Sequence, residues 1–497
     1  MKTKLQTNPP DNTLECSHPQ PGKPWRNNAL LGAAFAVALV AVQPAMAGDI
    51  FVIAMENHNF TQPNPVSSPQ QIFANPAAPF INSLITPGNP NAAHVSYATA
   101  YYNAGKGVHP SEPNYVWAEA GSDFGFHSDA DPNPASGNTF YDHAIHLTAQ
   151  LDAAGVSWKN YQEDVQLSAS PTNSAAGTNG PLNPFYGTAQ YNYAVKHNPM
   201  AFFADTALEN VFPLAQLFQD LNSQTTGRYN WITPNQFNDA HSALTGGFNY
   251  MGTHFTGDQA SIAQGDNFLA TIVPEIMASK AYQDNGTIII WWDETEGGDN
   301  AGFTIPEIII SPLAKGNAYA STVPLSHSSD IKTIEELFGL PFINNAIPLA
   351  ETNVQGGFSN VALASDLSDM FVPGTIPAAP NLSVTPGHLE YDRHTDRFVQ
   401  QMEIKNTGTT SVPAPFFLVL DNLSANATLI NSGGLKTTIL APLGSPYVSV
   451  NVRDHDHDGD DNVLPPHGTK IVNLEFINPS GAAITFDTRV LPVTPTP

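Results

Sequence analysis

Two uninterrupted apolar runs constrain the fold of this 497-residue chain more than any other feature. Residues 49–55 (DIFVIAM) and 287–292 (TIIIWW) have the length of strands and lack the alternation of polar and apolar side chains that a half-exposed strand shows. Runs of this kind are typical of strands buried on both faces of a parallel sheet. Because amphipathic helical patterns alternate with such strands, the sequence predicts an α/β sandwich.

The strongest helical pattern covers residues 262–280, where apolar side chains recur at helical spacing. Further helices are predicted at 77–85, 138–154, 206–221 and 329–337, and further strands at 156–161, 229–233 and 305–310. The strand at 305–310 is expected to resemble the one at 287–292. In sheets of this type, functional sites form at the carboxyl ends of the strands.

The pattern changes after residue 372. Residues 373–380 (PGTIPAAP) are predicted to form a stiff linker, because proline restricts the backbone. From 381 to 497, short strand-like segments alternate with turn residues, and helical patterns are absent. We therefore expect a catalytic domain at 48–372 and a C-terminal β-sandwich of immunoglobulin-like type at 381–497.

Residues 1–47 have the features of an export signal. Basic residues precede an apolar run at 29–42, and Ala45-Met46-Ala47 matches a cleavage site. Cleavage after Ala47 removes Cys16, the only cysteine, and predicts a periplasmic or secreted protein without disulfide chemistry. The apolar run is too short for an ordinary membrane span, so stable membrane insertion is not expected. The alternative is an uncleaved anchor at the membrane surface.

The charge balance restricts the partners. Acidic side chains outnumber basic ones 44 to 18, and cleavage after Ala47 changes the formal net charge from −26 to −28. So acidic a chain repels polyanions at long range, which argues against nucleic acid as a partner. A small phosphate ester or a phospholipid head group is compatible with this charge, because a bound metal ion reverses the local field. The sequence does not predict an oligomeric state.

Several polar clusters end predicted strands or lie in loops rich in Gly and Pro. They are Glu56-Asn57-His58-Asn59-Phe60, His109-Pro110-Ser111-Glu112-Pro113-Asn114-Tyr115, Asn238-Asp239-Ala240-His241, Trp291-Trp292-Asp293-Glu294 and, more weakly, Ser326-His327-Ser328. Together they offer oxygen ligands, imidazoles and a hydroxyl. That combination is what a metal ion beside a nucleophilic serine requires.

Each cluster also has a simpler interpretation. Ser111 could cap a helix that begins at Glu112 instead of acting as a nucleophile, although the two roles are compatible. Asp293 and Glu294 repel each other at the end of a buried strand and need a neutralising partner, unless they only start a solvated loop. His241 and His327 could be proton donors or structural histidines.

A further acidic segment, Asp454-His455-Asp456-His457-Asp458-Gly459-Asp460, begins like a calcium-binding loop. The twelfth position is Pro465, so the bidentate glutamate of such loops is missing. We keep a calcium ion and a solvated acidic loop as alternatives for residues 454–460.

Taken together, the clusters resemble the bacterial phosphoesterase family of acid phosphatases and phospholipases C in the alkaline phosphatase-like superfamily. The resemblance spans about residues 49–345 in a preserved order. The matching segments are ENHNF (56–60), HPSEPNY (109–115), WKNYQED (158–164), TPNQFNDAHS (233–242), WWDETEGGD (291–299) and SHSSDIKTIEELFGL (326–340). The resemblance implies a three-layer sandwich around a central, mostly parallel sheet. The C-terminal segment lies outside it.

The resemblance also implies site roles. One divalent metal ion (Mg, Ca, Mn or Zn) would be held by Glu56, Asn57, Ser111, Asp293 and Glu294. Ser111 would be the nucleophile that forms a phosphoserine intermediate. His241 and His327 are predicted catalytic residues, His109 and Asn114 are predicted to contact substrate, and Asp239 would belong to the half-site where two-metal relatives hold a second ion.

The expected function is hydrolysis of phosphomonoesters, as by an acid phosphatase. The alternatives are a phospholipase C and a non-catalytic surface binding protein. Two departures from lipase-type relatives favour a phosphatase: no acidic residue follows Phe60, and the expected nucleophile is Ser111 where phospholipases often have Thr. A third departure, Asn300 after Asp299, leaves the role of position 300 open.

Overall fold

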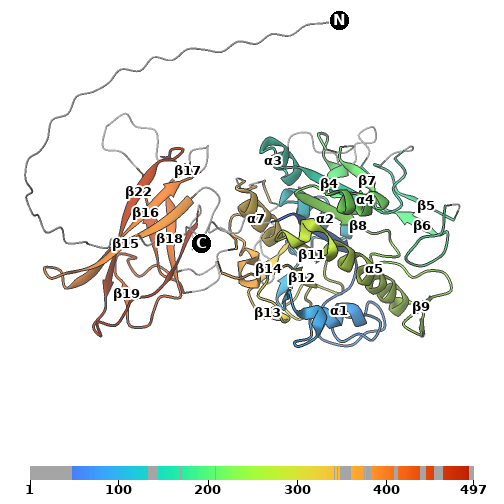
Figure 1. The fold of residues 1–497 in the computed structure, drawn as a ribbon, viewed down its shortest axis with the longest axis horizontal. Coiled ribbons are helices and arrows are strands. Elements are labelled where there is room, and N and C mark those ends of the chain that lie inside the picture. The colour runs from blue at the N-terminus through green and yellow to red at the C-terminus, as the bar shows by residue number, and fades with distance from the viewer. Residues whose placement is uncertain are drawn as a thin grey trace, which may run out of the picture. The chain divides into compact units, whose positions relative to one another are not determined.

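The computed structural model describes residues 48–132, 144–167, 171–178, 180–206, 209–340, 342–343, 345–347, 360–373, 375–376, 382–407, 412–436, 444–452 and 463–491. The predicted signal at 1–47, the calcium-like segment 454–460 and most of the linker 373–380 lie outside these residues. They remain predictions. Figure 1 shows the described elements.

A mostly parallel sheet of eight strands forms the centre of the N-terminal part (Figure 1). In spatial order the strands are β13 (Tyr319–Ser321), β2 (Val95–Ala98), β12 (Glu307–Ile310), β11 (Thr287–Trp292), β1 (Ile50–Met55), β8 (Tyr229–Thr233), β4 (Trp158–Gln162) and β7 (Val211–Pro213). β11, β1, β8, β4 and β7 are parallel to one another. The predicted α/β fold with a mostly parallel sheet is confirmed.

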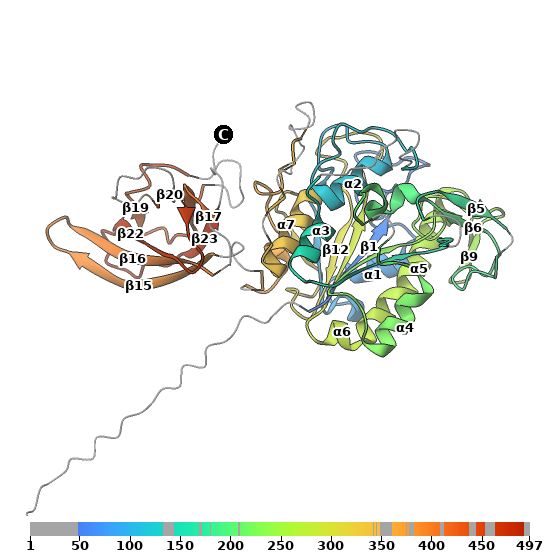
Figure 2. The same ribbon diagram turned by 90° about the horizontal axis from the view of Figure 1, so that it is seen from above.

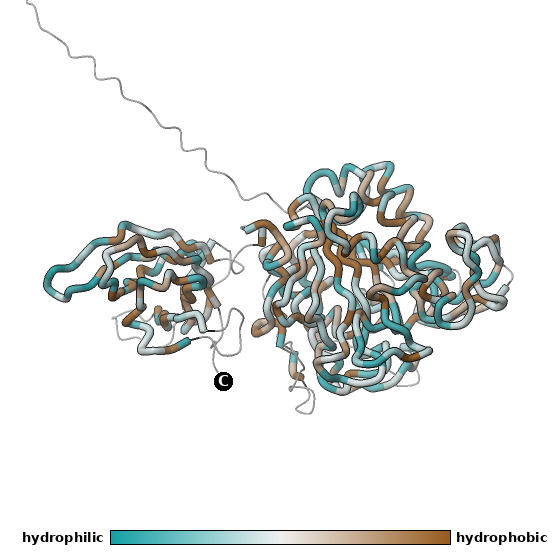
Figure 3. Tube along the Cα trace, turned by 90° about the horizontal axis from the view of Figure 1, so that it is seen from below, coloured by the Kyte–Doolittle hydropathy of each residue, from teal (hydrophilic) through white to brown (hydrophobic). Residues whose placement is uncertain are grey.

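The two apolar runs occupy the middle of this sheet. β1 pairs with β11 from Ile50 opposite Thr287 to Met55 opposite Trp292, and every residue of both strands is buried. Figure 3 shows brown, hydrophobic segments of the chain gathered in the interior of the N-terminal part. Because the two strands are parallel and end at the same level, the residues that follow them emerge side by side at one edge of the sheet.

Helices cover both faces of the sheet (Figure 2). The helices are α1 (Pro79–Leu84), α2 (Ser111–Ala120), α3 (Leu147–Ala153), α4 (Ala215–Ser223), α5 (Asp258–Ala278), α6 (Lys280–Gln283) and α7 (His327–Phe338). α2, α3 and α7 contact one another, and α5 contacts α1 and α6. The result is a helix–sheet–helix arrangement with one continuous apolar core.

Short elements complete this part of the chain. They are β3 (Tyr101–Tyr102) with β14 (Leu325–Ser326), β5 (Ala175–Gly177) with β6 (Tyr191–Tyr193), β9 (Phe248–Tyr250) with β10 (Thr253–Phe255), and the 3-10 helices η1 (Pro90–Ala92), η2 (Val195–His197), η3 (Pro199–Phe202) and η5 (Leu367–Met370). η2 matters most for function, because it follows β6 into the candidate site described below.

Three sequence-based expectations for this part need correction. The helix predicted at 138–154 begins only at Leu147, since the described residues 144–146 are not helical. The helix predicted at 206–221 is shorter, because Val211–Pro213 forms the edge strand β7 and the helix begins only at Ala215. Proline is tolerated on an edge strand, where its missing N–H is not needed for pairing. The strand predicted at 305–310 exists as β12, but it runs antiparallel to both β11 and β2. A continuous apolar run indicates that a strand is buried on both faces, but it does not indicate whether the strand is parallel or antiparallel to its neighbours.

The C-terminal segment consists of strands. One sheet has the order β15 (Leu382–Asp392), β16 (Arg397–Asn406), β22 (Thr469–Ile477) and β19 (Thr428–Leu429); another has β20 (Tyr447–Val450), β18 (Phe416–Asp421) and β23 (Asp487–Leu491); β17 (Val412–Pro413) pairs with β21 (Val463–Leu464). Side chains from both larger sheets share one apolar core. The immunoglobulin-like type of this segment stays a prediction. Within the described ranges, no helix is long and apolar enough to cross a membrane.

Candidate active site

The carboxyl ends of β1 and β11 bring four of the predicted ligands together. Glu56 and Asn57 follow β1, and Asp293 and Glu294 follow β11. The backbone N–H of Asn57 donates to Asp293 Oδ1 at 3.1 Å, and the N–H of Asp293 donates to the Met55 carbonyl at 3.2 Å. Asn57 has a φ of 49°, a left-handed conformation that Asn tolerates better than most residues. The sharp turn directs its backbone N–H toward Asp293.

Ser111 completes this group from the first residue of α2. Its Oγ lies 3.0 Å from Glu56 Oε2, 3.3 Å from Glu294 Oε1 and 3.5 Å from Asn57 Oδ1. The helix begins at Ser111 itself, and its N-cap residue is Pro110, which has no side-chain cap hydrogen bond. The alternative of Ser111 as a helix cap is therefore wrong, because its hydroxyl faces the carboxylates instead of the helix backbone.

The carboxylates of this site are buried close to one another. Burial, together with the charges of Asp293 and Asp239, raises the pKa of Glu56 well above its usual value. Burial and the neighbouring Glu294 raise the pKa of Asp293 to about 7. One oxygen of each, Glu56 Oε1 and Asp293 Oδ2, is buried without a hydrogen bond. Such an acidic group requires protons or a cation for stability.

These donors fit a hard divalent cation. The set consists of carboxylate, amide and hydroxyl oxygens, which suit Mg, Ca or Mn better than softer metals. Among the described residues, no group of three or more His, Cys, Asp or Glu side chains is arranged to hold a metal ion by itself. The metal role of the five predicted ligands stays a prediction.

The structure adds His197 and the preceding Lys196, which the sequence analysis did not single out. His197 in η2 is buried, with Nε2 3.1 Å from Glu56 Oε1 and Nδ1 3.3 Å from Asp239 Oδ2. Its ring stacks on Tyr115 with the centroids 4.9 Å apart. Burial and the adjacent Lys196 charge lower the pKa of His197 well below its usual value. The sequence signal was a Lys-His pair in a chain with few cations.

Asp239 and His241 lie on the far side of Glu56 from β11. The Asp239 carbonyl accepts the Glu56 N–H at 2.8 Å, and Asp239 Oδ1 accepts the His241 N–H at 2.7 Å. The rings of His241 and His197 are 6.1 Å apart. Burial lowers the pKa of His241 to about 4, and His241 Nδ1 lies 2.9 Å from the Ser242 hydroxyl. This placement is compatible with the half-site predicted from the resemblance.

His327 contacts the last residue of β11. Its Nε2 is 3.1 Å from the Trp292 carbonyl, while Nδ1 is buried without a hydrogen bond. The ring packs against Trp291 and Tyr101, with centroid distances of 4.8 and 5.6 Å. Burial lowers the pKa of His327 to about 3, so the imidazole is neutral at physiological pH. The ring supports the strand that carries Asp293.

The two predicted substrate contacts brace the loop before Ser111. His109 contacts Glu294 through Nδ1 and Asp299 Oδ1 at 3.1 Å through Nε2. The Asn114 amide donates to the carbonyls of Val108 at 3.1 Å and Pro110 at 3.3 Å. Both side chains therefore position neighbouring protein groups, and their contact with substrate stays a prediction. The side chain of the questioned residue Asn300 only accepts the Gly302 N–H at 3.0 Å and shapes its own loop.

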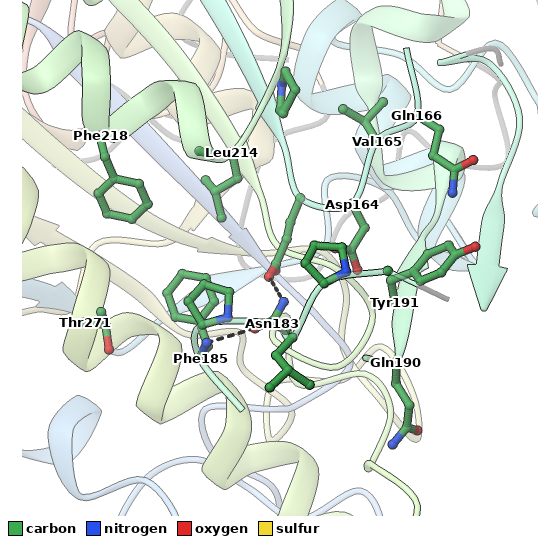
Figure 4. Close-up of a pocket in the computed structure, with 17 residues that line it drawn as sticks. Asp164, Val165, Gln166, Asn183, Phe185, Gln190, Tyr191, Leu214, Phe218 and Thr271 are labelled. Atoms are coloured by element: carbon green, nitrogen blue, oxygen red, sulfur yellow. Dashed lines mark hydrogen bonds between the residues drawn. The ribbon is translucent and has the colours of Figure 1, made fainter. Parts of the chain in front are cut away.

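A cavity of about 680 Å³ opens where β4 ends (Figure 4). Its lining is mainly apolar and includes Val165, Leu182, Phe185, Leu214 and Phe218. Glu163 also lines it and accepts from Asn183 Nδ2 at 2.5 Å and Asn238 Nδ2 at 2.9 Å. None of the predicted metal ligands lines this cavity. It is therefore a neighbour of the candidate site and not the place of its chemistry.

Several known proteins are similar in sequence to this chain. It is 26% identical to a phosphatidylinositol-3-phosphatase of Mycobacterium tuberculosis over 324 residues, which cover 65% of this chain and 88% of that protein. It is 31% identical to a probable acid phosphatase of Kluyveromyces lactis, covering 48% of this chain and 50% of that one. It is 24% identical to a phosphate-repressible acid phosphatase of Penicillium chrysogenum, covering 47% and 50%. The matches thus span about half the length of the fungal relatives.

Among solved structures, a protein of the alkaline phosphatase superfamily from Vibrio parahaemolyticus aligns over 72% of this chain and 76% of its own, with 11% identity and a TM-score of 0.38. That similarity is too low to carry an argument. A model of the Phosphoesterase family matches residues 83–341, just over half of the chain. With the acid phosphatase relatives, this match shows a hydrolase that acts on phosphoric esters. The chain belongs to the Phosphoesterase family.

Proposed function

We propose that this protein is an exported, metal-dependent phosphomonoesterase with Ser111 as its nucleophile. The observation that carries the proposal is the position of the Ser111 hydroxyl, 3.0 to 3.5 Å from oxygens of Glu56, Glu294 and Asn57. A hydroxyl that only stabilised a helix would not be directed into a group of buried carboxylates. The N-terminus of α2 further favours an anionic transition state at this position.

In the proposed reaction, Ser111 Oγ attacks phosphorus in line with the leaving oxygen. The Ser111 hydroxyl loses its proton to water, the Oγ–P bond forms, the ester P–O bond breaks, and the leaving oxygen takes a proton from water. His241, whose pKa is lowered to about 4, is neutral near pH 7 and is not assigned this proton. Water then hydrolyses the phosphoserine and releases inorganic phosphate. A divalent ion held by the predicted ligands would lower the serine pKa and neutralise charge on the phosphoryl oxygens.

The names of the relatives favour the monoester. A phosphatidylinositol-3-phosphatase and acid phosphatases both remove a terminal phosphate group, whereas a phospholipase C cleaves a diester. We therefore place phosphomonoesters, including those of lipid head groups, before phospholipase substrates. The alternative of a non-catalytic binding protein is not favoured, because the Ser111 hydroxyl and its acidic neighbours are assembled for chemistry. Export rests on the predicted signal at 1–47 alone.

The test compares hydrolysis of p-nitrophenyl phosphate and p-nitrophenyl phosphorylcholine, before and after chelation. Ser111→Ala is expected to lower kcat by about 10³-fold or more while the fold persists. Ser122→Ala is the matched control, since that buried hydroxyl, just past the other end of α2, donates to the Ala346 carbonyl at 2.8 Å. Hydrolysis of the diester alone would support a phospholipase C, and undiminished turnover by Ser111→Ala would exclude this nucleophile.

A further inference from the structure

Lys196 is a cation placed unusually deep beside the acidic site. Its side chain is 13% exposed, and its Nζ pairs with Asp129 Oδ2 at 2.9 Å. The next residue, His197, lies between Glu56 and Asp239. η2 thus brings one basic side chain to a site otherwise dominated by carboxylates. A buried ammonium group loses hydration, so its position needs an explanation beyond solubility.

Asp129 connects Lys196 to the nucleophile's helix. While Oδ2 accepts from Lys196, Oδ1 accepts the backbone N–H of Glu112 at 3.1 Å. Glu112 directly follows Ser111 at the start of α2, a helix of ten residues. One carboxylate therefore bridges an ammonium group and a helix N-terminal N–H, next to the proposed nucleophile. These two donors are of the kind that bind phosphoryl oxygens.

The Lys196 charge also affects the acidity of the neighbouring carboxylates. Although burial alone would lower it, the carboxylates of Glu56, Asp129 and Asp293 raise the pKa of Lys196 above its ordinary value. In turn, the Lys196 charge opposes the rise in the pKa of Glu56 and of Asp239. The geometric link between Lys196 and the site of Ser111 is the Asp129 carboxylate, which contacts Lys196 Nζ and the Glu112 N–H.

We propose that Lys196 Nζ and the Glu112 N–H form the subsite for the non-bridging phosphoryl oxygens, and that the Asp129 carboxylate occupies this subsite until substrate displaces it. The proposal rests on the proposed function and names the substrate class more closely. A phosphomonoester dianion offers enough charge and free oxygens to replace a carboxylate, whereas a diester carries one negative charge. Because a third of the Asp129 side chain is exposed (34%), solvent can take over its hydrogen bonds when substrate displaces it.

The test measures binding of inorganic phosphate to the metal-loaded full-length protein by calorimetry, and its inhibition constant in p-nitrophenyl phosphate hydrolysis. Lys196→Met is expected to weaken phosphate binding about tenfold or more, because it removes a charge-assisted hydrogen bond. Asp129→Asn is expected to tighten it several-fold, because the competing charge is gone. The double variant should match Lys196→Met, and Lys196→Arg should restore much of the affinity.

A second ion pair of the same kind provides the control. Lys159 Nζ lies 2.7 Å from Asp220 Oδ2, and Lys159→Met should leave phosphate binding unchanged. The proposal is overturned if Lys196→Met has no effect, or if both single variants weaken binding equally, as loss of a purely structural ion pair would. In either case, the proposed function still holds if the wild-type protein hydrolyses the monoester. A wild type that neither binds phosphate nor hydrolyses esters with any divalent ion would overturn both.

Discussion

The His109 side chain shows how one residue can set the properties of a ligand. Burial alone would lower its pKa, but the carboxylates of Asp299 and Glu294 raise it to about 10, so the ring is a cation at neutral pH. It holds Glu294 in the position where that carboxylate also meets Ser111. In this role His109 resembles the outer partners that orient ligands around protein-bound metals.

We expect His109→Gln to weaken binding of Mg²⁺ or Mn²⁺ about 10- to 100-fold, because Glu294 loses its orienting partner. Titration calorimetry with the metal alone measures this directly and does not depend on turnover. His254→Gln is the control, since His254 lies on β10 and contacts Asn249. If the His109 variant binds the metal ion as tightly as wild type, His109 does not orient Glu294 for metal binding. Its predicted contact with substrate would then be the remaining role.

Asp330 illustrates the energetic cost of burying acids behind the site. It accepts a hydrogen bond from Tyr101 OH, and burial raises its pKa from 3.8 to about 7. The folded protein thus retains a proton that the unfolded chain loses near pH 4. Stability from this group is full at low pH and falls as the pH rises toward 7.

We therefore expect Asp330→Asn to raise the free energy of unfolding by about 1–3 kcal/mol relative to wild type at pH 8 and by less at pH 5. The asparagine oxygen can still accept from Tyr101. Urea unfolding at both pH values measures the difference, with Glu275→Gln on the exposed side of α5 as control. A gain of the same size at pH 5 would show that the effect does not come from this proton.

At the scale of elements, α5 fixes the loop that carries Asp239 and His241. Gly265 in the middle of this helix faces Ala240, and a Cβ there would lie 2.9 Å from Ala240 Cβ and 3.0 Å from Met55 Cε. Both neighbours adjoin site residues, because Met55 precedes Glu56. A glycine costs helix stability, so its presence here reflects the close approach of helix and loop.

Gly265→Ala is expected to lower kcat/KM about tenfold or more, since a small displacement of Ala240 misplaces neighbouring site groups. The gain in helix propensity, about 1 kcal/mol, should offset part of the packing cost, so the protein should remain folded. Steady-state kinetics and thermal unfolding separate the two effects. Glu275→Ala on the same helix serves as the control, and undiminished activity of Gly265→Ala would show that the loop adapts.

The elements that the sequence predicted best are those with a strong local pattern. The runs TIIIWW and DIFVIAM predicted β11 and β1 with bounds that differ from the observed ones by at most one residue. The apolar periodicity at 262–280 correctly predicted the helix α5. The predicted helix at 206–221 was wrong in its first half, because residues 211–213 are held in the sheet by pairing with β4, a contact between distant segments. Periodicity reports the burial of a segment, but the partner that buries it decides its structure.

At the scale of the whole molecule, the candidate site depends on convergence that no local pattern reveals. The ends of β1 and β11 could be expected to meet, because polar pairs follow two buried strands. The positions of Lys196 and His197 could not be expected, since both lie in a 3-10 helix without periodicity. His197 reaches Glu56, and Lys196 reaches Asp129, only through the folding of the chain between β4 and β8. Similarly, the role of Asp129 could not be predicted, because it depends on the contact of its carboxylate with the Glu112 N–H at the N-terminus of α2.

Because the predicted ligands meet only in the folded protein, binding of the predicted metal ion should stabilise the fold as a whole. Glu56, Asp293 and Glu294 are all buried, and they meet around Ser111 and the Asn57 backbone at the ends of two central strands. Without a cation, these carboxylates must hold protons, and the pKa of Asp293 is raised to about 7. Metal binding therefore has to release those protons, and it becomes more favourable as the pH rises.

We expect Mg²⁺ or Mn²⁺ at 100 times its Kd to raise the free energy of unfolding by about 2.7 kcal/mol, and chelation to reverse this. The rise in Tm on metal addition should be larger at pH 8 than at pH 5, because at pH 5 protons compete for the carboxylates. Asp293→Asn should abolish most of the metal effect at both pH values. A Tm that does not respond to any divalent ion at pH 8 would contradict a metal site here, since buried carboxylates that bind a cation only in the folded state must couple its binding to folding.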